Sequence, residues 1–239
     1  MSYYNKKYEK LDLSDMQYLN NGSCAKIFCN KNIIFKEYYQ KTIIDYRLNE
    51  KMFDILKNIK NPHFIELFDI YSDFNYIELL GNKIKIIPFI VHAYTAMYYP
   101  DDSVNALFEH KDYILDNFRE LEILFKLFTE NMICTDDIKR DNAILGKNNI
   151  VIIDPDFFYT VETSNKEYVS TLNKLKLLNL FRSILINSIV GEADLTYGKI
   201  IAYIENELVN IEVTDRTDIT YEISKTLKNI KKPIELFRR

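Results

Sequence analysis

Apolar residues in the second half of the chain recur every three or four positions, which is the spacing of one face of an α-helix. The pattern predicts a long helix that ends just before residue 137 and a second helix ended by Gly191. Shorter helices are predicted over residues 201–211 and 219–230. The stripes of the two long helices are Ile114, Phe118, Leu121, Phe125, Phe128 and Met132, and then Leu172, Leu175, Leu178, Phe181 and Leu185.

The first half of the chain holds shorter apolar runs, which are typical of β-strands. One helix is predicted among them, over residues 42–60, and residues 29–32 read as a turn. Strands that flank one helix and precede a mostly helical remainder indicate an α+β fold. The helix stripe is Leu48, Met52, Ile55 and Ile59, and the strand candidates are 33–36, 64–71, 83–90 and, further on, 150–153.

Composition narrows the class of protein. With 239 residues, 47% of them hydrophobic and 28% charged, the chain is long and apolar enough for one substantial core. The net charge of -4 argues against a nucleic-acid partner, and the basic cluster at 225–232 is expected to be a solvated helix face. The longest apolar run, 84–96, is too short and too interrupted to span a bilayer. Residues 1–20 lack a signal-peptide core and the three cysteines fit no metal spacing, so we expect a cytoplasmic or other reducing compartment.

The candidate chemistry lies in a short loop and at the end of the strand after it. Two carboxylates, a lysine and an amide are gathered there. Phosphoryl transfer needs a carboxylate to orient the attacking hydroxyl, a cation near the moving phosphate, and oxygen ligands for Mg²⁺. In that order, the residues that would supply these groups are Asp137, Lys139, Asn142 and Asp154.

This stretch resembles the catalytic loop of the protein kinase family. It reads Thr-Asp-Asp-Ile-Lys-Arg-Asp-Asn over 135–142 and Asp-Pro-Asp over 154–156, where the family has H-R-D-L-x-x-x-N and D-F-G. Lys139, two places after Asp137, resembles the serine/threonine branch of the family. The resemblance covers residues 17–160, and the remainder is similar only in its helical character.

The resemblance implies one bilobal kinase-like domain over residues 1–239. A small antiparallel sheet with one helix would form the amino lobe at 15–90, a hinge would lie at 91–94, and a shortened, mostly helical carboxyl lobe would fill 95–239. ATP and Mg²⁺ would be the cofactors. The implied nucleotide-binding positions are Asn20, Gly22, Ala25 and Ile27 in a degraded glycine loop, Lys36 on the next strand, and Val91 and Ala93 in the hinge.

The partner of Lys36 is open between two acidic residues. Glu50 is the only glutamate of residues 42–60, and its surroundings resemble the family helix. At about 100° per residue, however, it lies nearly opposite the apolar stripe. Asp45 lies nearer the stripe and is the alternative, while the family register would place Met52 at the glutamate position.

Several substitutions imply that regulation differs from that of most kinases. In regulated members an arginine before the catalytic aspartate pairs with a phosphate, but here that residue is Asp136, which would repel one. Thr135 and Pro155 replace a packed histidine and phenylalanine. Asp156 stands at a glycine position, where it is either a further metal ligand or a turn residue. We therefore expect a minimal kinase without a phosphorylation switch.

Three functions fit these observations. The first is phosphorylation of serine or threonine in a protein, or autophosphorylation, with Asp137 and Lys139 as catalytic residues. The second is a small-molecule kinase of the aminoglycoside or choline kinase type, whose members usually carry histidine at the position of Lys139. The third is a pseudokinase that acts as a binding module or as another nucleotide transferase, which the degraded glycine loop favours. We expect a protein substrate as partner, and neither a nucleic acid nor a membrane.

Overall fold

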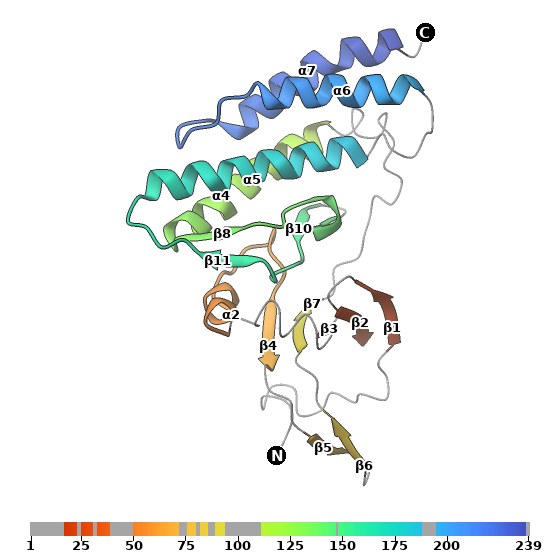
Figure 1. Cartoon of the computed structure of the whole chain (residues 1–239), viewed down its shortest axis with the longest axis vertical. Helices are drawn as coiled ribbons and strands as arrows, with labels where there is room; N and C mark the ends of the chain where they lie inside the picture. Colours follow the sequence, from red (N-terminus) through yellow and green to blue (C-terminus); the bar gives the residue numbers. More distant parts are fainter. Residues whose placement is uncertain are drawn as a thin grey trace. The chain divides into compact units, whose positions relative to one another are not determined.

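The computed structural model of the chain forms two compact units (Figure 1). Unit 1 comprises Met1–Lys60 and Ile65–Thr95, and unit 2 comprises Asn61–Phe64 and Ala96–Arg239. Both helices and small antiparallel sheets are present, so the predicted α+β class is confirmed. The structure describes residues 17–22, 25–30, 33–38, 50–71, 76–79, 82–85, 89–93, 111–146, 148–187 and 195–237.

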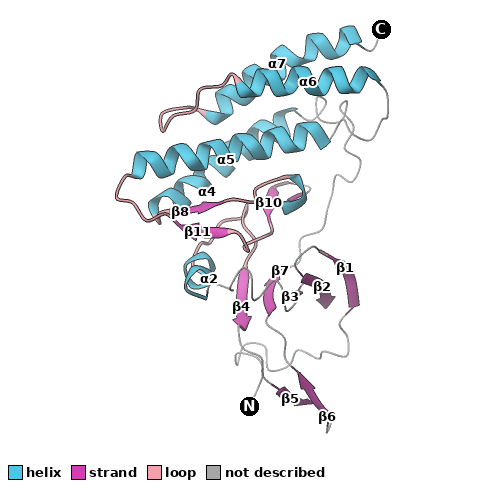
Figure 2. Cartoon of the chain, viewed as in Figure 1, coloured by secondary structure: helices cyan, strands magenta, loops and turns pink. Residues whose placement is uncertain are grey.

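Unit 1 is built around a five-stranded antiparallel sheet, with one helix among its described residues (Figure 2). The strand order is β1-β2-β3-β7-β4, and a separate hairpin pairs β5 with β6. Residue Lys36 of β3 lies opposite Ile27 of β2 on one side and Ile90 of β7 on the other. The strands are β1 (Gln17–Asn21), β2 (Ala25–Asn30), β3 (Ile33–Tyr38), β4 (Leu67–Tyr71), β5 (Tyr76–Leu79), β6 (Asn82–Lys85) and β7 (Phe89–Ala93).

Two predicted strands of unit 1 need correction. The first was expected over 64–71, but β4 begins at Leu67, and Phe64 instead forms an isolated bridge in unit 2. The second, expected over 83–90, corresponds to two strands, β6 and β7, with residues 86–88 outside the described ranges. In both cases a continuous apolar run spans more than one element, because periodicity alone does not mark where pairing ends.

The helix of unit 1, α2 (Glu50–Lys57), is shorter than the described part of its prediction and is rotated relative to it. Its buried side chains are Met52, Phe53 and Leu56, whereas Ile55, predicted to lie in the stripe, is partly exposed. The buried face therefore includes Phe53, which was not in the predicted stripe, and leaves out Ile55, which was. The stripe also included Ile59, which lies past the helix end, and Leu48, which is outside the described residues.

Among its described residues, unit 2 contains four long helices, and most residues of the predicted stripes lie in its core (Figure 2). Phe118 of one helix and Phe181 of the next are both fully buried and meet edge to face, with ring centroids 5.7 Å apart. Helix α5 begins where the Asn165 side chain accepts a hydrogen bond from the Tyr168 amide at 3.1 Å, which is an N-cap. The helices are α4 (Lys111–Glu130), α5 (Lys166–Asn187), α6 (Leu195–Val209) and α7 (Ile219–Phe237).

Three predicted core residues of unit 2 are not buried in the structure. Met132 follows the end of α4 and has a left-handed φ of 57°, so the helix stops before it. Leu172 is partly exposed and Leu175 is 38% exposed, whereas Leu177, two positions further on, is buried. The predicted end of α5 at Gly191 lies outside the described residues. The helix predicted over 201–211 corresponds to α6, which begins earlier, at Leu195, and ends at Val209, and the helix predicted over 219–230 corresponds to α7, which continues to Phe237.

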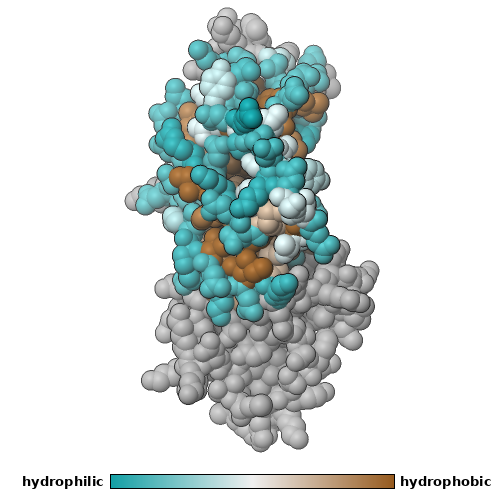
Figure 3. All heavy atoms as spheres, turned by 90° about the vertical axis from the view of Figure 1, so that its left-hand side faces the viewer, coloured by the Kyte–Doolittle hydropathy of each residue, from teal (hydrophilic) through white to brown (hydrophobic). Residues whose placement is uncertain are grey.

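The surface of the described residues is mainly polar. On the face drawn in Figure 3, hydrophilic residues dominate and hydrophobic side chains gather only in small patches. None of the helices in the described ranges has the length and apolar character that a membrane-spanning helix requires.

Two short antiparallel pairs complete unit 2, and the segment 61–64 packs with one of them. The His63 carbonyl accepts a hydrogen bond from the Ile152 amide at 2.9 Å, and His63 Nδ1 donates to the Ile150 carbonyl at 2.9 Å. Phe64 stacks edge to face on Phe128 and Phe158. The pairs are β8 (Ile133–Thr135) with β11 (Phe158–Thr160), and β9 (Ala143–Leu145) with β10 (Ile150–Ile152).

Candidate functional site

The loop that follows β8 is closed by one side chain. Residues 136–139 run without regular structure into a short 3₁₀ helix, η3 (Arg140–Asn142). The side-chain nitrogen Nδ2 of Asn142 donates to the Asp137 backbone carbonyl oxygen at 2.8 Å and to Asp137 Oδ2 at 2.9 Å. Asn142 is buried and Asp137 is partly exposed, so both bonds are partly shielded from water. They fix the direction of the Asp137 carboxylate.

Lys139 contacts both oxygens of the same carboxylate, and it donates to Oδ2, the oxygen that Asn142 also uses, at 3.1 Å. Its Nζ lies 2.9 Å from Asp137 Oδ1, and the Lys139 side chain is 47% exposed. The hydrogen bond to Asp137 raises the pKa of Lys139, and the charges of Asp137, Asp141 and Asp154 add to this effect. The ammonium therefore stays charged at neutral pH in the middle of an acidic group.

Asp154 reaches this group from the end of β10. The Ile153 amide donates to the Asn142 carbonyl at 3.0 Å, which brings the strand end to the loop. Asp154 Oδ1 accepts the Asp156 amide at 3.2 Å, so Asp156 takes part in a turn. Unit 2 therefore brings together all four residues that the sequence assigned to phosphoryl transfer.

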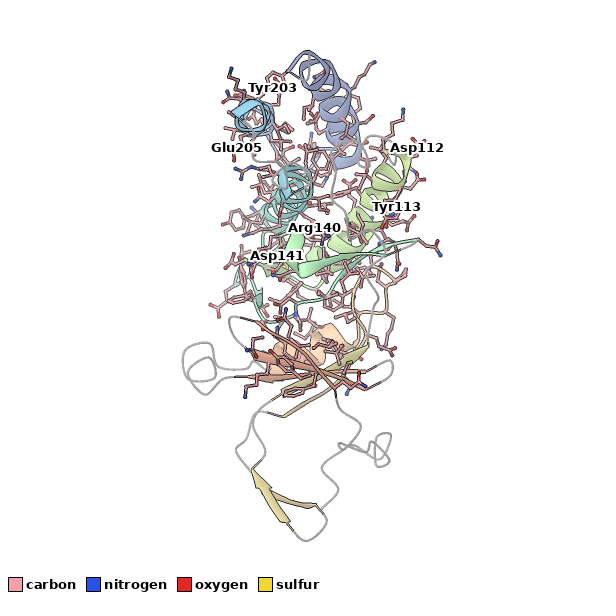
Figure 4. The ribbon with its side chains drawn as sticks, turned by 90° about the vertical axis from the view of Figure 1, so that its right-hand side faces the viewer. Asp112, Tyr113, Arg140, Asp141, Tyr203 and Glu205 are labelled. Carbon is pink, nitrogen blue, oxygen red and sulfur yellow. The ribbon has the colours of Figure 1, made fainter. Side chains whose placement is uncertain are left out.

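Neighbouring residues of η3 have opposite environments (Figure 4). Arg140 is buried and its guanidinium donates to the Ala143 carbonyl at 2.9 Å, whereas Asp141 is exposed. The Arg140 amide donates to Ser183 Oγ of α5 at 2.8 Å. The loop thus rests on α5 at its far end.

The near end of the loop also contacts α5, through residues that the sequence did not predict. Lys176 Nζ lies 3.0 Å from Asp136 Oδ1, and the Tyr159 hydroxyl donates to the same oxygen at 3.3 Å. Asn173 donates to the Ile133 carbonyl at 2.9 Å. The two pairs with α5 join residues 40 positions apart and the Tyr159 pair joins residues 23 apart, so no local pattern in the sequence could have indicated them.

In unit 1, the predicted phosphate-covering residues lie in the β1–β2 hairpin. Asn20 and Ile27 are cross-strand neighbours, and the Gly22 amide donates to the Ala25 carbonyl at 2.8 Å. A Cβ at Gly22 would meet that oxygen at 3.5 Å, an ordinary contact, so the turn itself does not require glycine. Lys36 is 8% exposed, which is unusual for a lysine.

The remaining predicted nucleotide positions are placed only in part. Val91 and Ala93, expected in a hinge, lie in strand β7 opposite Phe35 and Ile33, so the connection to unit 2 begins later than predicted. Glu50 is the first residue of α2, and its side chain is outside the described part of the structure, as is Asp45. The choice between these two partners for Lys36 therefore stays open.

Comparison with known proteins does not name the site. No protein-family model matches the sequence, and no curated protein matches it either. Within the described ranges, no group of three or more His, Cys, Asp or Glu side chains is arranged to hold a metal ion. The predicted metal ligands are a smaller set, one amide and one carboxylate.

Proposed function

We propose that this chain is an ATP- and magnesium-dependent kinase that phosphorylates serine or threonine hydroxyls of a protein. Units 1 and 2 would be the amino and carboxyl lobes of a kinase-like fold. The observation that carries the proposal is the loop closed by Asn142, in which a carboxylate is held in a fixed direction with Lys139 and Asp154 beside it.

The hydrogen bonds of the loop suit a general base. Asp137 would orient the substrate hydroxyl and accept its proton as the phosphoryl group is transferred. Lys139 is already paired with this carboxylate, and its ammonium would stabilise the transferred phosphate from the same place. A carboxylate that is held in one direction before the substrate arrives loses little entropy when the hydroxyl binds.

The loop and the segment that follows β10 carry oxygen atoms of the type that suits magnesium. Asn142 uses its amide nitrogen for both bonds to Asp137, and its Oδ1 takes no part in either. This oxygen and a carboxylate oxygen of Asp154 are ligands of the type that Mg²⁺ prefers. When bound, the ion would neutralise charge on the phosphate oxygens.

Unit 1 supports the nucleotide half of the proposal. Protein kinases carry the phosphate-pairing lysine on the third strand of the amino lobe, and Lys36 lies on the third strand of the unit 1 sheet. Its near-complete burial keeps it away from bulk water, as expected of a lysine that serves a specific partner. The hairpin of Gly22 precedes it, as a phosphate-covering loop would.

Incubation with radiolabelled ATP and magnesium tests the transfer step. The wild type should label itself or a generic protein substrate, and Asp137→Ala should lower the rate by roughly 10²- to 10⁴-fold because the general base is lost. Asp141→Ala is the matched control, since it removes an exposed carboxylate from the same loop. Equal labelling by the wild type and Asp137→Ala would refute the proposal.

Two further measurements separate the other functions. A coupled ADP-release assay with a metabolite and antibiotic panel would reveal a small-molecule kinase, because turnover would occur without a protein acceptor. Thermal denaturation with ATP and magnesium reports binding alone, since a ligand that binds the native state raises its midpoint. A raised midpoint without transfer would indicate a pseudokinase.

A further inference from the structure

Two carboxylates stand side by side at the start of the candidate catalytic loop, and each has its own lysine. Asp137 pairs with Lys139 at 2.9 Å, and Asp136 pairs with Lys176 at 3.0 Å. The second pair is unequal in exposure: the Asp136 side chain is 65% exposed, whereas Lys176 is 21% exposed. The cation is therefore the anchored member of the pair, and the loop is attached to it.

Polar side chains on one side of helix α5 contact the loop and the strand before it at both ends. Asn173, Lys176 and Ser183 are three and seven residues apart, spacings that keep them on neighbouring positions around the helix. They contact, in the same order along the chain, the Ile133 carbonyl, the Asp136 carboxylate and the Arg140 amide. Figure 1 shows α5 next to β8. Lys176 is the only one of the three whose contact is a charge pair.

We propose that Lys176 is a positioning residue for Asp137. By pairing with Asp136, it ties the start of the loop to α5 and so keeps the neighbouring Asp137 in place. The Tyr159 hydroxyl supports the same Asp136 oxygen from β11. The consequence for catalysis rests on the proposed function, whereas the consequence for loop order does not.

Four single variants and one double variant, which combines Lys176→Met with Asp136→Asn, test this role. Lys176→Met keeps the aliphatic stem and removes the charge, Lys176→Arg keeps the charge, and Asp136→Asn removes the partner from the exposed side. Lys126→Met is the matched control, because Lys126 is an exposed lysine of α4 with no ion pair among the described residues. Hydrogen exchange of the amides of residues 136–142 and steady-state kinetics with ATP and a generic protein substrate are measured for each.

In Lys176→Met and Asp136→Asn, amide exchange in the loop should be about tenfold faster than in the wild type. The kcat should fall roughly 10- to 100-fold with little change in the KM for ATP, because the fault is in geometry rather than in binding. The double variant should lose no more than either single one. Lys176→Arg and Lys126→Met should behave like the wild type.

Exchange and kcat that are unchanged in Lys176→Met would overturn the inference. So would an equal loss in Lys176→Arg, since that result would indicate a packing role of the lysine stem. If the wild type transfers no phosphate at all, the proposed function fails, and the exchange measurements still decide whether Lys176 positions the loop.

Discussion

The two stretches that resemble kinase motifs, the loop 136–142 and the β1–β2 hairpin, are stabilised by different kinds of contact. In unit 2, the loop 136–142 is fixed by buried residues and by hydrogen bonds from α5 and β11. In unit 1, every residue of β1 is exposed, and the turn at Gly22 is closed by a backbone bond to Ala25. The groups proposed for chemistry are thus fixed by packing, and the hairpin proposed to cover phosphates mainly by strand pairing. Substitutions should cost more in the loop than in the hairpin.

The largest effect should come from Asn142, which closes the loop. Asn142→Ala removes both bonds to Asp137 and the oxygen proposed for magnesium, so we expect phosphoryl transfer to fall by roughly 10³-fold or more. Asn148→Ala, an exposed asparagine a few residues on, should leave the rate within about twofold of the wild type. Transfer rates with radiolabelled ATP measure both. Equal rates in the two variants would contradict the importance of loop closure.

A matched pair of glycines compares the two regions directly. In Gly146→Ala, the new Cβ would meet the Asn149 carbonyl oxygen at 2.8 Å in the β9–β10 turn, and we expect a loss of about 1–3 kcal/mol. In Gly22→Ala, the nearest atom is at 3.5 Å, so stability should change by less than about 1 kcal/mol, in the stabilising direction. Urea denaturation followed by circular dichroism measures both. A more costly change at Gly22 than at Gly146 would reverse the comparison.

The smallest effect concerns alkaline pH in unit 2. Burial raises the pKa of the Cys134 thiol above its ordinary 9.0 and also raises that of the Tyr159 hydroxyl, and the hydrogen bond to Asp137 raises that of Lys139. A group whose pKa is higher in the folded state stabilises the protein fully below its unfolded pKa. That stabilisation is lost as the pH rises through the folded value.

The thermal midpoint should therefore fall as the pH rises above about 9, where Cys134 begins to titrate in the unfolded chain. Melting curves at intervals between roughly pH 7 and 11 measure this. Cys134→Ala removes one of the contributing groups, so its midpoint should fall less steeply than that of the wild type. A midpoint that is constant or rising over this range would contradict the assignment.

The parts of the fold that the sequence predicted best are those with strong local periodicity. Helices α4 and α5 repeat their apolar residues over several turns, so an error at one position, such as Met132 or Leu175, leaves the helix itself unchanged. Helix α2 is short, and one large aromatic residue, Phe53, is enough to rotate its buried face. Short elements give tertiary packing more freedom to override the pattern.

In the site too, residues close together in the sequence were predicted, whereas contacts between distant segments were not. Asp137, Lys139 and Asn142 lie within one short stretch, so their spacing alone places them on one loop. Lys176 and Ser183 contact that loop from about forty residues away, and only the packing of α5 brings them there. The predicted hinge was displaced because the end of a strand such as β7 is set by its pairing with β3 rather than by composition.

The segment Asn61–Phe64 has a consequence for dissecting the molecule. The chain passes from unit 1 into unit 2 at this segment, returns to unit 1 for β4 to β7, and enters unit 2 again after Thr95. A fragment that begins at residue 96 would leave the amide of Ile152 and the carbonyl of Ile150 without the His63 groups that satisfy them. Expression of unit 2 by itself should therefore require the tetrapeptide 61–64, joined by a linker or supplied in trans.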